Sequence, residues 1–218
     1  MSLLWTLLSS PAKAFQQIGA EKKTKGFLAI LLAWVLVAAL GMVTVPAVVA
    51  ESMTLVENQV QGMDMSSLMP MMVVTTIIFA LIGMVLGIFL LACLYLFLAF
   101  IFRDRVEGTA ITFKKALQLA FIVNLPAQLG AALYSIVIYS IAIPGLPQVI
   151  LQYLNPFYLI TFIWLFFAAK YTMKLTQAKA LIVVAIAVAI HFAFAGYQIY
   201  STVNYTVPTV EQSININI

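Results

Sequence analysis

Only a few side chains in this sequence could take part in chemistry. The chain contains one histidine, His191, one cysteine, Cys93, and seven acidic residues. A metal site needs several histidine, cysteine or carboxylate groups that converge, and a hydrolase needs a nucleophile beside a base. All the acidic residues lie outside the long apolar runs, so neither kind of site can be assembled within those runs. The sequence therefore predicts no metal, no cofactor and no enzymatic activity.

His191 lies near the middle of an apolar run. A titratable side chain is costly there unless it is neutral, paired or faces a cavity. One interpretation is a site that responds to protons or to a ligand. The other is a neutral imidazole that donates a hydrogen bond to a neighbouring helix, and the lack of any carboxylate within the apolar runs favours this structural interpretation.

A second group of polar candidates surrounds Pro126 in another apolar run. Pro126 cannot donate a hydrogen bond to the carbonyl group of Ile122, so a helix should kink there. Asn124, Gln128 or water could then bond to the freed oxygen. Interrupted helices can line substrate sites in the middle of a membrane, but no matching break occurs in an inverted second half, which favours a structural kink.

Composition indicates that these residues are surrounded by lipid. Hydrophobic residues make up 64% of the chain and charged residues 8%, and the mean hydropathy is +1.10. Soluble domains are about half apolar and about a quarter charged, so this chain could not cover a water-exposed surface. The net charge is +4, with basic residues in short clusters. These clusters suit an anionic membrane surface and not nucleic acid.

Five apolar stretches are long enough to cross a hydrocarbon core of about 30 Å as helices. A β-barrel would show alternating polarity, whereas these stretches are continuously apolar. We therefore expect an all-α, polytopic membrane protein in which residues 27–203 form a five-transmembrane-helix bundle. The expected spans are 27–50, 71–102, 116–143, 154–173 and 180–203.

The basic residues indicate the orientation, because lysine and arginine near the ends of spans are retained in the cytoplasm. They precede the first span, lie between the second and third, and flank the turn between the fourth and fifth; the other connecting segments contain none. We expect a cytoplasmic N-terminus and an external C-terminus. Residues 1–26 then form a cytoplasmic or interfacial amphipathic segment, and residues 204–218 form a short extracytoplasmic tail.

Within the first segment, Ser10 and Pro11 predict a helix start, with Ser10 as N-cap and Pro11 at the first helical position. Phe15 and Ile18 share one face of this helix. We expect that face to lie among the lipid headgroups, with a loosely ordered terminus as the alternative.

Small residues at helical spacing indicate where helices can approach closely. Gly83 and Gly87 remove the side chains from one face of the second span. We expect packing inside the monomer, with dimerisation as the alternative. Similar strips occur in the third span (Ala127, Gly130, Ala131) and in the fifth (Ala185, Ala189, Ala193).

Charged residues between the second and third spans form a candidate cytoplasmic surface for a partner, although solvation and anchoring alone would also account for them. They are Arg103, Asp104, Arg105, Lys114 and Lys115.

These features resemble the Yip family, the Ypt-interacting membrane proteins, and especially its prokaryotic members. The segments that carry the resemblance are Ser10-Pro11-Ala12-Lys13-Ala14-Phe15, Thr112-Phe113-Lys114-Lys115-Ala116-Leu117-Gln118 running on to Asn124-Leu125-Pro126, Trp164, and Gln177-Ala178-Lys179-Ala180.

The resemblance implies a helical bundle with a cytoplasmic N-terminus and, in eukaryotic members, an association with Rab-type GTPases and vesicle membranes. The short N-terminal region here lacks the Asp-Leu-Tyr-Gly-Pro pattern of those members, so we do not expect a Rab-type GTPase as partner. We expect a multi-pass protein of a prokaryotic inner (plasma) membrane that acts through contacts with lipid, other membrane proteins or a second copy of itself. The alternative is a small transporter or channel for an ion, a lipid or an apolar solute.

Overall fold

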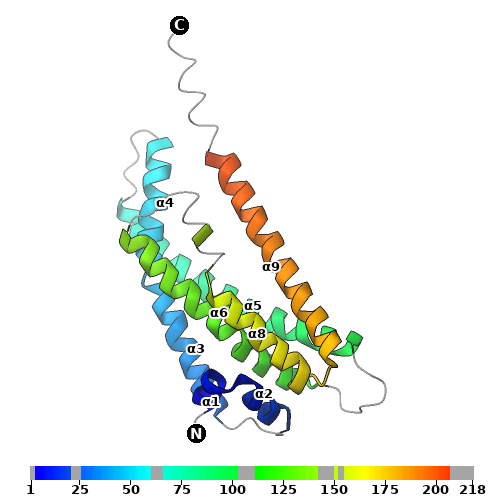
Figure 1. The fold of residues 1–218 in the computed structure, drawn as a ribbon. Coiled ribbons are helices and arrows are strands. Elements are labelled where there is room, and N and C mark those ends of the chain that lie inside the picture. Colours follow the sequence, from blue (N-terminus) through cyan, green and yellow to red (C-terminus); the bar gives the residue numbers. More distant parts are fainter. Residues whose placement is uncertain are drawn as a thin grey trace.

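The computed structural model describes residues 3–20, 26–59, 66–102, 111–141, 150–151 and 155–206, and every regular element among them is helical (Figure 1). This confirms the predicted all-α fold. In chain order the elements are α1 (Leu3–Ser9), α2 (Pro11–Ala20), α3 (Phe27–Met42), α4 (Val45–Gln59), the 3₁₀ turn η1 (Ser66–Leu68), α5 (Met69–Phe102), α6 (Phe113–Ile141), α8 (Phe157–Phe167), the π-helical turn η2 (Ala168–Thr172) and α9 (Gln177–Thr206).

Four helical segments in the described part of the chain are long and apolar enough to cross a membrane. A fifth, formed by α8 and η2, is apolar but shorter than the others, so the five expected spans correspond to four of membrane length and one short helix. The four are Phe27–Met53, Met69–Phe102, Phe113–Ile141 and Gln177–Ser201.

The first span is interrupted by a turn at residues 43–44, which the sequence prediction missed. Pro46 has no N–H group to donate to the carbonyl group of Met42, so the regular helical hydrogen bond is lost at this point. At the turn, the N–H group of Val43 bonds to the carbonyl oxygen of Leu40, 3.2 Å away, which lies three residues back and not the helical four. After the turn, α4 continues to Gln59, beyond the expected end of the span at residue 50.

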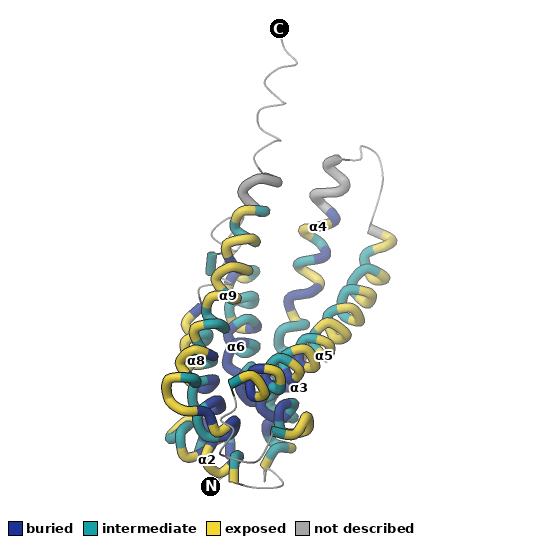
Figure 2. The backbone as a smooth tube through the Cα atoms, turned by 90° about the vertical axis from the view of Figure 1, so that its right-hand side faces the viewer, coloured by how far each residue is buried: buried dark blue, intermediate teal, exposed yellow. Residues whose placement is uncertain are grey.

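The main hydrophobic core lies toward the end of the molecule that carries α1 and α2, where the buried residues gather (Figure 2). Its central element is α6, which packs against α3, α5 and α8. Trp34 of α3 meets Phe121 of α6 edge to face, with 5.3 Å between the ring centroids. This core holds α6 in place, and α6 in turn packs against α8.

Away from this core, the helices separate. Three residues of α4 (Val45, Val49, Met53) form a small cluster with side chains near the start of α5. The second half of α9 stands apart from the other helices (Figure 1), and Phe192, Phe194, Tyr197 and Tyr200 on it are exposed. In a bilayer these surfaces face lipid or another protein.

The N-terminal helices belong to the core. Phe15 and Ile18 of α2 and Leu7 of α1 are completely buried. Phe15 packs edge-on against Trp164 of α8, with ring centroids 6.4 Å apart. The hydroxyl group of Thr172 in η2 donates a 3.0 Å hydrogen bond to the carbonyl oxygen of Phe15. The expectation that this apolar face lies among lipid headgroups is therefore wrong, because α8 and η2 cover it.

Candidate functional site

The start of α8 is defined by Asn155 and Pro156. Proline suits the first helical turn, because its fixed φ is helical and its missing N–H group has no partner there in any case. The side-chain oxygen of Asn155 accepts a 3.1 Å hydrogen bond from the N–H group of Phe157. Asn155 is only 3% exposed, so this cap is held firmly at the beginning of α8.

Gly130 of α6 provides the space for this cap. A Cβ atom at residue 130 would lie 2.6 Å from both Asn155 Oδ1 and Phe157 Cβ. No real side chain tolerates such distances, so α6 and α8 can meet here only through glycine. Ala127, one turn earlier on α6, is also buried, whereas Ala131 is half-buried.

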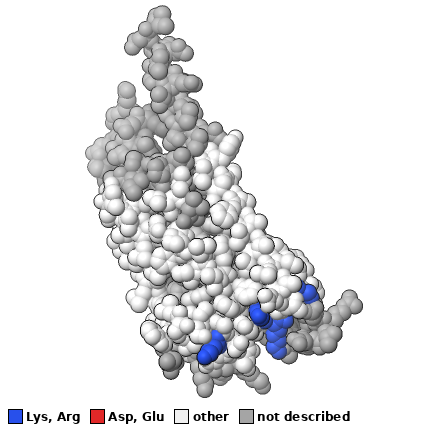
Figure 3. All heavy atoms as spheres, viewed as in Figure 1, with Lys and Arg blue, Asp and Glu red and all other residues white. Residues whose placement is uncertain are grey.

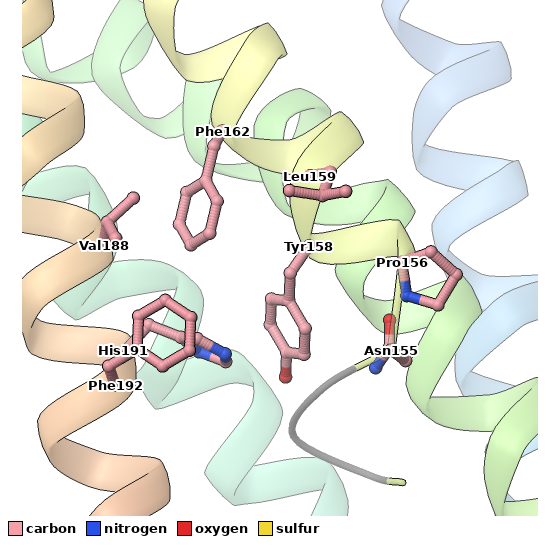
Figure 4. Close-up of a pocket in the computed structure, with 8 residues that line it drawn as sticks. All are labelled: Asn155, Pro156, Tyr158, Leu159, Phe162, Val188, His191 and Phe192. Atoms are coloured by element: carbon pink, nitrogen blue, oxygen red, sulfur yellow. The ribbon is translucent and has the colours of Figure 1, made fainter.

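A pocket of about 320 Å³ lies between the start of α8 and the middle of α9 (Figure 4). Most of its wall is apolar, with three side chains that can form hydrogen bonds: Asn155, Tyr158 and His191. The lining residues are Asn155, Pro156, Tyr158, Leu159 and Phe162 on the α8 side and Val188, His191 and Phe192 on α9.

His191 is half-buried against two aromatic residues of α8. Its ring centroid lies 4.0 Å from that of Tyr158 and 5.8 Å from that of Phe162. Figure 4 shows Tyr158 between His191 and Asn155, so the three polar side chains follow one another along one side of the pocket. Each of the three also interacts within the chain. The site can therefore hold a molecule that combines apolar surface with a group that forms hydrogen bonds.

The second group of predicted polar residues lies elsewhere. Asn124, Pro126 and Gln128 do not line this pocket. Pro126 is buried, and α6 continues through it without interruption from Phe113 to Ile141. Asn124 and Gln128 are half-buried on α6. The structure thus separates the two groups that the sequence singled out.

Sequence reasoning missed Asn155 and Tyr158 as members of the site. An asparagine followed by proline just before an apolar run is a recognisable helix start, so Asn155 could have been found as a cap. Tyr158 gave no such signal, because its contact with His191 depends on how α8 lies against α9.

Two of the predicted small-residue strips face outward. A Cβ atom at Gly83 or Gly87 would meet nothing within 4 Å among the described residues. The reason is that α5 presents a different face to the core. Within the described segments, the expected contact inside the monomer is therefore not made at these positions, and contact with another chain stays a prediction. The strip on α9, Ala185, Ala189 and Ala193, is likewise exposed.

The candidate cytoplasmic surface is only partly described. Arg103, Asp104 and Arg105 lie outside the described residues, while Lys114 is exposed and Lys115 half-buried at the start of α6. The described lysines lie on α2, the start of α6, η2, the turn after it and the start of α9, and Figure 3 shows the lysines visible in that view gathered toward one end of the molecule.

Apolar helices of membrane length, packed with the shorter helices α1, α2 and α8 around one core, define a multi-pass helical membrane protein. The family model of the Yip1 domain matches residues 5–197, and the chain belongs to this family, as the resemblance indicated. No curated protein and no solved structure matches the chain.

Proposed function

We propose that this Yip-family protein is a non-enzymatic membrane component that acts through contacts with other membrane proteins or lipids. We place it in a prokaryotic plasma membrane, with its N-terminus in the cytoplasm. The gathering of the lysines toward one end supports this orientation, because basic residues are retained on the cytoplasmic side.

The observation that carries the proposal is the open face of α5 at Gly83 and Gly87. A Cβ atom at either glycine would meet no atom of the described part of the chain within 4 Å. Large apolar residues beside them, Leu86 and Leu90, are 56% and 67% exposed. Glycines four residues apart let a second helix approach closely, and van der Waals contact then stabilises the pair.

Site-specific photo-cross-linking in native membranes tests this proposal. A photoreactive residue at position 87 should give discrete adducts with a protein or a particular lipid. Val85 is a matched control, because it is 63% exposed and lies on roughly the opposite side of the same helix. Identical adducts with bulk lipid at both positions would count against the proposal.

Transport is the alternative that the sequence left open. A continuous polar cavity that reaches both His191 and Pro126 would favour transport, and the pocket at His191 does not include Pro126. Solute flux into liposomes that carry the protein, abolished by His191→Ala, would replace the proposed function with transport.

A further inference from the structure

We propose that the pocket between α8 and α9 binds an amphiphile from the bilayer, one with an uncharged head that forms hydrogen bonds, such as a hydroxyl or ester group, and an apolar chain. This inference rests on the proposed function. It names the chemical class of one lipid that the protein would contact.

The pocket lies at the depth of the hydrocarbon core. Lys170, Lys174 and Lys179 place the turn between η2 and α9 at the membrane surface. At about 1.5 Å per residue, Tyr158 is about 21 Å along α8 and η2 from Thr172. His191 is about 21 Å along α9 from its start at the same turn. Both side chains therefore lie inside a hydrocarbon layer of about 30 Å.

Exposure indicates how a ligand would enter. The rim of the pocket includes Leu159 and Phe192, which are 65% and 53% exposed, whereas Asn155 on its inner side is 3% exposed. At this depth an exposed residue faces acyl chains and not water. A ligand therefore enters sideways from the lipid and must itself be soluble in lipid.

The lining selects the chemistry of the head. None of the described lining residues is a lysine, an arginine or a carboxylate, and a charged group in an apolar site without a partner is strongly disfavoured. Asn155, Tyr158 and His191 already interact within the chain. An amide, a hydroxyl group and an imidazole each have more than one hydrogen-bonding position, so they can also bind a neutral oxygen of a ligand.

The size of the pocket limits how much of the ligand it encloses. A pocket of about 320 Å³ is near the lower end of the range for small-molecule sites, about 300 to 1,000 Å³. It can hold the head and the first part of an apolar chain between the rings of Tyr158, Phe162 and Phe192. The remainder of the chain would lie in the bilayer, along the exposed second half of α9.

Photolabelling of the full chain in phosphatidylcholine liposomes tests the inference, with a long-chain fatty alcohol that carries a diazirine as the probe. We expect saturable labelling that maps to residues 155–162 or 188–192. Unlabelled fatty alcohol should compete, whereas an alkane of the same length should not, because only the alcohol can bond to the polar side chains.

Tyr158→Phe removes only the hydroxyl group and should weaken labelling about three- to tenfold, the range expected for one hydrogen bond. Tyr197→Phe is the matched control, because Tyr197 is 65% exposed on α9 and does not line the pocket. His191→Gln, checked for unchanged thermal unfolding in detergent, supplies a second variant and should weaken labelling in the same way.

Three results would overturn the inference: labelling that does not saturate, labelling that the alkane inhibits as well as the alcohol does, and equal labelling of Tyr158→Phe, His191→Gln and Tyr197→Phe. Cross-linking at position 87 is a separate measurement. Discrete adducts at position 87 without pocket labelling would contradict only this inference. Pocket labelling with only bulk-lipid adducts at position 87 would contradict the proposed contact through α5 and support the pocket.

Discussion

At Gly130 the backbone of α6 touches the cap of α8. Asn155 both caps α8 and lines the pocket. The absence of a side chain at Gly130 therefore determines where the Asn155 amide group lies in the site. Gly83 and Gly87, by contrast, have no neighbour in the described structure that a side chain would meet. The same residue type thus has a local role that depends on which way its helix faces.

Gly130→Ala should destabilise the protein by about 1 to 3 kcal/mol, the usual cost of overpacking a tight contact. The new Cβ atom would lie 2.6 Å from Asn155 Oδ1 and from Phe157 Cβ. Phe157 Cβ is attached directly to the backbone, and Asn155 Oδ1 is held by its hydrogen bond from the N–H group of Phe157. Gly83→Ala is the control and should cost nothing, since its surroundings are open. Unfolding in mixed detergent micelles measures both, and equal stability of the two variants would contradict the assigned contact.

The sequence predicted that His191 needs a neighbour, because an imidazole within an apolar run requires a partner or a cavity. The structure places its ring centroid 4.0 Å from that of Tyr158, in the wall of the pocket, and both interpretations of His191 stay predictions. The identity of that neighbour could not be predicted, since it depends on the packing of two helices whose residues are apolar on every side. Uniformly apolar helices carry no periodic signal that shows which face is buried.

Among the elements, α2 and η2 form a unit that ties the N-terminal segment to the membrane domain. The π-helical turn brings the Thr172 hydroxyl group to the carbonyl oxygen of Phe15. Gly19 then lies so close to η2 that a Cβ atom would be 2.6 Å from the carbonyl oxygen of Tyr171. The sequence showed the amphipathic pattern of α2 but not its partner, because lipid and protein both satisfy an apolar face.

Thr172→Val should loosen α2, because it removes the buried hydrogen bond, worth about 0.5 to 1.5 kcal/mol, that joins η2 to the Phe15 carbonyl group. Hydrogen exchange of residues 3–20 should become faster. Thr161→Val is a matched control, since its hydroxyl group bonds only within α8, to the carbonyl oxygen of Phe157. Unchanged protection of residues 3–20 in Thr172→Val would show that the bond does not hold α2.

Over the whole molecule, the main core is concentrated toward the end that carries the N-terminal helices, and farther away α4 and the start of α5 share a smaller cluster (Figure 2). Hydropathy predicted the helices and their order well, because long apolar runs leave few alternatives. It did not reveal the turn at residues 43–44 or the shortness of α8, since neither changes the apolar character of the chain.

The orientation can be measured with reporter fusions. We expect alkaline phosphatase fused after residue 218 to be active outside the cytoplasm, and a fluorescent protein fused before Met1 to fluoresce inside, because the basic residues hold the N-terminal end in the cytoplasm. A phosphatase fused before Met1 is the control and should be inactive. An inactive phosphatase at residue 218 beside an active one at Met1 would reverse the proposed topology.

The shortness of α8 also relates the protein to the acyl chains around it. With η2, this helix spans Phe157–Thr172, about 24 Å at the ordinary rise per residue, while the neighbouring helices are long enough to cross about 30 Å. Such a mismatch costs a fraction of a kcal/mol for each ångström, and local thinning of the bilayer relieves it. Short-chain lipids should therefore gather beside α8, next to the opening of the pocket. The lipids that surround this part of the protein should then depend on the thickness of the host membrane.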